Sequence, residues 1–135
     1  MATDTVGSGA YRNIYAMTHF LCKAIAFSNV AAAVTVGKLP AGAMVVNAGV
    51  VVTTSFNAAT TNTIDIGTSG TPASYASAIA LGVVGRILAD DLGISTLLYN
   101  ATADVTVTAT VAATGAAATT GAGFVFVEFV LPANA

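Results

Sequence analysis

The stretch DVTVTATV at residues 104–111 places valine or alanine at every second position, with threonine or aspartate between them. Side chains of a β-strand point alternately to its two faces, so this pattern predicts a strand with one apolar and one hydroxyl-bearing face. A second stretch, GFVFVEFVL at residues 123–131, is apolar on both faces. Such a strand is expected to meet the core on one face and another molecule on the other. We expect the two strands to pair as an antiparallel hairpin across the small-residue loop at residues 112–123.

Further strands are predicted upstream, where β-branched runs are separated by turns rich in glycine, asparagine and threonine. The run at residues 43–56 is too long for one flat strand, so we expect a bend or bulge at Asn47–Gly49. Other strands are expected at residues 34–36, 63–67 and 95–99.

Two segments are open to more than one interpretation. Ile14, Met17, Leu21 and Ile25 have helical spacing, but residues 20–27 also fit a strand, and we favour a strand that ends at a turn at Ser28–Asn29.

Residues 72–81 fit a short helix with Thr71 as its N-cap and Pro72 at its first position. The same residues also fit a long irregular loop that lies on the sheet.

These elements together predict an all-β protein, an antiparallel β-sandwich or jelly-roll-like fold with at most one short helix. The length of 135 residues is typical of one domain. We expect an extended N-terminal arm at residues 1–10, which are small and polar, and a single β-sandwich domain at residues 11–135.

The chain carries very little charge. Charged residues make up 7% of it and hydrophobic residues 56%, whereas an ordinary soluble domain has about 25% charged residues. A monomer of this composition would expose much neutral or apolar surface and would tend to associate. The composition therefore favours a protein whose surface is largely covered by partners, including copies of itself.

Composition also argues against two classes of partner. Four basic residues and a net charge of −2 do not supply the cationic face that nucleic acid requires. Mean hydropathy is +0.82, and residues 39–64 and 105–127 carry no charge. Both stretches are interrupted by turn residues or alternate as strands, so we expect no membrane-spanning helix.

No catalytic, metal or cofactor site is predicted. His19 and Cys22 are three residues apart, so on a strand they point to opposite faces. Asp90–Asp91 lacks the spaced ligands of a calcium loop, and we interpret it as a turn. Asp65 is expected to face solvent or to pair with a basic residue. The glycine stretch at residues 67–70 has no lysine after it, unlike a phosphate-binding loop.

Three motifs carry a resemblance to a known group of proteins. Residues 38–46 read KLPAGAMVV, residues 52–57 read VTTSFN, and residues 63–68 read TIDIGT. Together with the C-terminal strands, they resemble small accessory virion proteins of tailed bacteriophages, of the head decoration or cement type. The resemblance covers about residues 33–132 and carries no catalytic residue with it.

The resemblance implies a non-enzymatic structural protein on the outer surface of a phage head, bound to the major capsid protein. We expect a homo-oligomer, with a trimer favoured, and we expect residues 1–15 and the strand at residues 124–130 to make the contacts. The alternative is a tail, fibre or head-spike component that touches the host. For that role Tyr75 and Tyr99 are the candidate contact residues.

Overall fold

The computed structural model describes residues 17–89, 92, 98–100 and 103–131. Within them the chain forms nine β-strands and one short 3-10 helix. Their bounds are β1 His19–Ala26, η2 Phe27–Asn29, β2 Ala33–Leu39, β3 Ala43–Thr54, β4 Thr61–Thr68, β5 Ala76–Ala80, β6 Gly85–Leu88, β7 Tyr99–Asn100, β8 Val105–Thr114 and β9 Ala122–Val130.

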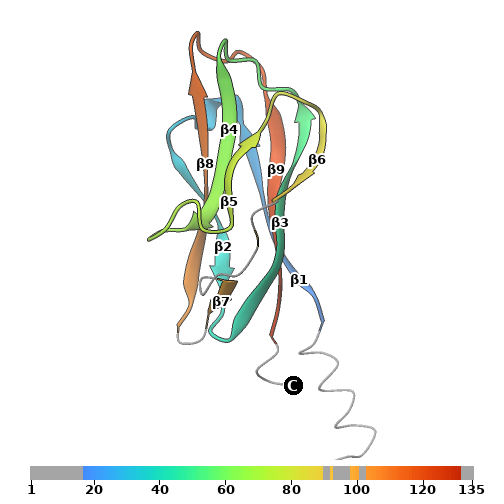
Figure 1. The fold of residues 1–135 in the computed structure, drawn as a ribbon, viewed down its shortest axis with the longest axis vertical. Helices are drawn as coiled ribbons and strands as arrows, with labels where there is room; N and C mark the ends of the chain where they lie inside the picture. Colours follow the sequence, from blue (N-terminus) through green and yellow to red (C-terminus); the bar gives the residue numbers. More distant parts are fainter. Residues whose placement is uncertain (1–16, 90–91, 93–97, 101–102, 132–135) are drawn as a thin grey trace, which may run out of the picture.

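The strands form two antiparallel sheets that lie face to face (Figure 1). The first, sheet A, has the order β1-β9-β3-β6, and the two-residue strand β7 pairs with the start of β3. The second, sheet B, has the order β2-β8-β4-β5. The predicted all-β sandwich is therefore confirmed.

The strand order is that of a jelly roll. The strands form four nested antiparallel pairs, and successive pairs lie alternately in sheet A and sheet B. The pairs are β1–β9, β2–β8, β3–β6 and β4–β5. This arrangement is the double Greek key that defines jelly-roll domains. Strand β7 stands outside this nested set.

The expected hairpin between the two C-terminal strands is wrong. Strand β8 lies in sheet B, between β2 and β4, whereas β9 lies in sheet A, between β1 and β3. Both strands present an apolar face to the core, so the local pattern alone allows either partnership. The loop between them, residues 115–121, crosses from one sheet to the other.

Residues 72–81 form neither of the two structures considered for them. Strand β5 occupies Ala76–Ala80 at the edge of sheet B, and the Tyr75 N–H donates to the Ile66 carbonyl at 2.9 Å. Tyr75 is 1% exposed, and this burial raises the pKa of its phenol. Burial of Tyr75 and Ile79 in the core outweighs the local helix signals of Thr71 and Pro72.

Strand β1 confirms the strand interpretation of the N-terminal region and ends where the 3-10 helix Phe27–Asn29 begins. In β3 the register shifts between Val45 and Asn47, just before the expected bulge. The expected arm at residues 1–10, residues 11–16 and most of the expected strand at 95–99 lie outside the described residues. None of the described segments forms a helix long and apolar enough to cross a bilayer.

The core fills the space between the two sheets and is rich in β-branched side chains, which suit pleated surfaces. Its largest side chains with almost no exposure come from both sheets and from the 75–81 segment: Tyr75, Leu39, Ile64, Ile66, Leu81, Val50, Val52, Val107, Val111, Val125 and Val127. Inward positions of β9 follow period two, since Val125, Val127 and Phe129 are buried. The same strand therefore places its alternate residues outside the sandwich.

Removal of two methyl groups from the core should weaken the fold measurably. Val127 is fully buried and Val83 is 71% exposed. We expect Val127→Ala to lower the free energy of unfolding by about 2–3 kcal/mol, because it removes apolar burial and leaves a cavity. The matched control Val83→Ala should change it by less than about 0.5 kcal/mol. Urea denaturation of both variants measures the difference, and equal costs would contradict the placement of the core.

Candidate functional surface

The outer faces of the two sheets differ in chemistry, and sheet B presents mainly hydroxyl groups. On β8 the threonines at 106, 108 and 110 lie on the outward side, although Thr108 is only 7% exposed, while Val107, Ala109 and Val111 are buried in the core. Thr35 of β2 lies opposite Thr108, and the hydroxyls of Thr61 and Thr114 lie 2.7 Å apart. The threonine face that the sequence predicts is therefore part of a broader hydroxyl-bearing face.

Asp65 on this face has a structural partner. Its Oδ1 accepts the Ala78 N–H at 2.7 Å, and Ala78 has a φ of 53°, which an L-residue rarely adopts. The carboxylate therefore stabilises an irregular point in the edge strand β5. Asp65 lies on the outer face, as one of the two expected alternatives has it, and its partner is a backbone amide and not a basic residue.

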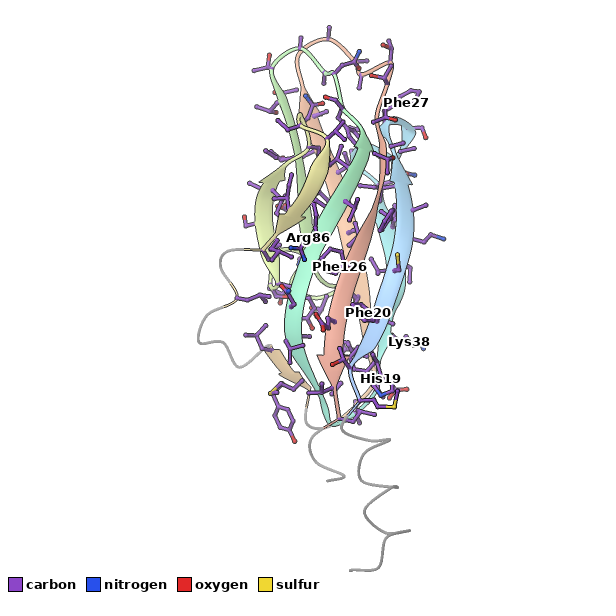
Figure 2. All side chains as sticks on the ribbon, turned by 90° about the vertical axis from the view of Figure 1, so that its right-hand side faces the viewer. His19, Phe20, Phe27, Lys38, Arg86 and Phe126 are labelled. Atoms are coloured by element: carbon purple, nitrogen blue, oxygen red, sulfur yellow. The ribbon has the colours of Figure 1, made fainter. Side chains whose placement is uncertain are left out.

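The outer face of sheet A is largely apolar (Figure 2). Its outward residues fall into rows set by the strand register. One row runs Ala24, Phe124, Val51 and Arg86 across β1, β9, β3 and β6. The next runs Cys22, Phe126, Gly49 and Leu88, and a third runs Phe20, Glu128 and Asn47.

Several large apolar side chains on this face are open to solvent. Phe20 is 63% exposed, Val46 42%, Leu88 39% and Phe124 37%. Large apolar side chains gathered on one face of a soluble domain commonly mark an interaction surface. The apolar outer side of residues 124–130 is thus one strip of a four-stranded face.

A shallow groove of about 420 Å³ lies in this face. We call it the sheet A groove. It is lined by Phe20, Cys22, Asn47, Val51, Arg86, Phe124, Phe126 and Glu128.

Gly49 shapes the groove. A Cβ atom at Gly49 would lie 2.5 Å from the Ile87 carbonyl oxygen and 2.9 Å from Cζ of Phe126. The absence of a side chain therefore lets the Phe126 ring lie close over the backbone of β3, as aromatic residues often do beside a strand glycine. Any larger residue would raise the floor of the groove.

Two opposite charges border the groove on different strands. Arg86 is on β6 and Glu128 is on β9, and both are among its lining residues. Neither side chain makes a hydrogen bond or ion pair within the part of the chain that the structure describes. An apolar groove with one cation and one anion left open can recognise a partner that supplies the complementary charges.

His19 and Cys22 do not form a pair, because they lie on opposite faces of β1 as predicted. The His19 ring stacks on the Phe129 ring with centroids 5.3 Å apart, and Cys22 is exposed in the groove. No cluster of three or more potential metal ligands occurs among the described residues. Asp90–Asp91, interpreted from sequence as a turn, lies outside them.

The glycine stretch at residues 67–70 closes a tight turn. Thr68 and Thr71 exchange backbone hydrogen bonds of 3.0 and 3.1 Å. A Cβ atom at Gly67 would collide with the carbonyl oxygens of Thr71 and Pro72. Close packing of the loop onto the strand accounts for this glycine without a bound phosphate.

Sequence reasoning found Phe124 and Phe126 but missed Phe20, Asn47, Val51 and Arg86 as neighbours in one groove. The period-two pattern of β1 and the glycine within β3 were the available signals. Neither says which strands lie side by side, and the groove exists only because the jelly-roll order places β1, β9, β3 and β6 in one sheet.

No known family model matches the chain, and no curated protein matches its sequence. Solved structures that share its fold include two from phage capsids. One is a chain in the capsid asymmetric unit of cyanophage Pam1, with 27% identity, a TM-score of 0.64 and 85% of each chain covered. Another is in the acid-stable capsid of Helicobacter pylori bacteriophage KHP30, with 22% identity, a TM-score of 0.63, and 87% of this chain and 90% of that chain covered.

Substitution of Gly49 should disturb both the fold and the groove. We expect Gly49→Ala to lower the free energy of unfolding by about 1–3 kcal/mol, because the new methyl group meets the backbone of β6. Gly70→Ala is the matched control, since no atom lies within 4 Å of its Cβ position. That control should change stability by less than about 0.5 kcal/mol. Thermal unfolding compares the two, and a neutral Gly49→Ala would refute the close approach of β3 and β6.

Proposed function

We propose that the chain is a structural protein of a tailed-bacteriophage particle, and that it decorates the outer surface of the head as a cement protein. The observation that carries the proposal is the likeness to a chain of the Pam1 capsid over 85% of both chains. That likeness supports a structural role in a phage virion. The decoration role itself rests on the sequence motifs and on the surface chemistry of the fold.

The proposed mechanism is passive. A cement protein binds neighbouring shell subunits and resists their separation. Burial of apolar surface contributes about 25 cal/mol per Å², reduced by the entropy lost on association. A bond of modest strength is sufficient because it is repeated over the whole shell. The apolar outer face of sheet A and the low overall charge fit a protein that works while covered by partners.

The partners we propose are the major capsid protein and other copies of this chain, with a trimer as the proposed oligomer. The proposed shell contacts are residues 1–15 and the strand at residues 124–130. The described part of β1 starts at the same end of the molecule at which β9 stops, since His19 lies opposite Phe129 (Figure 1). An arm and the end of this strand could therefore act at one end of the molecule.

Host contact by a tail, fibre or spike component has less support. Tyr75 is 1% exposed and cannot reach a receptor, whereas Tyr99 is 46% exposed. A second pocket of about 260 Å³ is lined by Phe27, Val30 and small residues between positions 113 and 118. None of its lining residues has a charged or amide side chain of the kind that recognises glycans.

The copy number per virion tests the decoration role. Quantitative mass spectrometry of purified virions should find this chain in hundreds of copies, in a simple ratio to the major shell protein. The regular shell offers one equivalent site many times over. A handful of copies would instead indicate a tail or vertex component, and absence from the particle would refute a virion role.

Deletion of residues 1–10 tests the arm. We expect the truncated protein to bind undecorated capsids at least about tenfold more weakly, which corresponds to about 1.4 kcal/mol. Thermal unfolding of the truncated protein serves as the control for folding. If it unfolds like the full chain and binds capsids equally well, the arm is not a contact element.

A further inference from the structure

The free edges of the two sheets are poorly suited to pairing with another chain. The longest edge strand, β1, carries Lys23 at its centre. Charges on edge strands oppose edge-to-edge association. At the other edge of sheet A, β6 is only four residues long.

The edges of sheet B are also poorly suited to pairing with another chain. The register of β2 is interrupted between Thr35 and Gly37, and Lys38 follows. The opposite edge, β5, has five residues and is distorted at Ala78, where φ is 53°. Bulges and short strands prevent continuous pairing, so self-association of this chain is expected to use a face of the sandwich.

The outer face of sheet A has the size that a stable interface needs. With about 3.4 Å per residue along a strand and about 4.8 Å between strands, strands β1, β9, β3 and β6 cover a flat area of about 540 Å². The accessible area is larger because side chains project from it. A typical interface buries about 800 Å² on each partner, so this one face is large enough for specific association.

The charges of the sheet A groove complement each other. Arg86 and Glu128 have opposite signs and lie on different strands. Arg86 is exposed, Glu128 is half-buried, and neither side chain has a partner among the described residues. In a contact between two identical surfaces related by a two-fold axis, residue i of one copy meets residue j of the other, and the reverse also holds. A second copy of this face therefore supplies each charge with its missing partner.

We propose that two copies of this chain associate through the outer faces of sheet A, with Arg86 of each copy opposite Glu128 of the other. The exposed phenylalanines on β1 and β9, Phe20 and Phe124, form the apolar part of the contact around these two ion pairs. A two-fold contact joins only two copies of the face, so it produces a dimer or links two trimers. This inference goes beyond the decoration role. It assigns the outer side of residues 124–130 to a second copy of the chain and leaves residues 1–15 as the proposed shell contact.

Charge reversal in the purified full-length chain tests the proposal. Sedimentation velocity over a range of concentrations gives the dissociation constant of the two-fold contact. Arg86→Glu and Glu128→Arg should each weaken association at least about tenfold, because like charges then face each other in the interface. The double variant with both changes restores opposite charges across the contact and should return within about threefold of the original affinity.

Lys38→Glu is the matched control, since it makes the same charge change as Arg86→Glu at an exposed position on sheet B. It should leave association unchanged. Cys22, which lines the groove, provides a second readout without mutation. Its reaction with a maleimide should slow as the protein concentration rises and the groove becomes covered.

Three results would overturn the proposal. The first is a chain that stays monomeric at every concentration at which it is soluble. The second is an assembly whose dissociation constant is unchanged by either single charge reversal and in which Cys22 remains fully reactive. A trimer that forms through another surface would behave in this way. The third is a double variant that associates no better than the single ones. Each leaves the virion copy number, and therefore the proposed function, untouched.

Discussion

The apolar layer between the two sheets is the constraint on which the rest of the structure depends. Valine and isoleucine from β3, β4, β8 and β9 meet there with almost no solvent exposure. Such close packing leaves few alternatives for register, because a shift by one residue would turn every buried side chain of a strand outward. The threonines of β8 and the outer residues of β9 are thereby assigned to opposite outer faces of the sandwich. The contrast between a hydroxyl-bearing face and an apolar face follows directly from this layer.

Much of the fold could be predicted because strand periodicity is a local property. The alternation at residues 105–111 identified the buried and the outward face of β8 correctly, and the apolar run at residues 124–130 identified β9 as a strand. Their pairing could not be predicted in the same way, because each strand needs only an apolar surface beneath it and many partners provide one. Strand β5 was missed because Thr71 and Pro72 resemble a helix start, while the burial of Tyr75 and Ile79 depends on the opposite sheet.

In the candidate surface, too, residues of a single strand could be predicted from sequence, whereas neighbours contributed by other strands could not. Phe124 and Phe126 were predicted to contact a partner from the composition of one strand. Arg86 joins them only because β6 lies two strands away from β9 in the folded sheet. Sequence separation hides such groupings, since a groove across a sheet combines residues from every strand it crosses.

The register between β1 and β9 also decides how the protein transmits mechanical load. His19 begins an eight-residue strand whose residues are all paired with β9, from His19 with Phe129 to Ala26 with Ala122. A force that enters at His19 and pulls along the strand axis acts in shear, so the backbone hydrogen bonds between the two strands resist it together. A force directed across the sheet would peel the same bonds apart one after another. The β1–β9 pair therefore resists a pull along its strands better than a pull that separates its common end at His19 and Phe129.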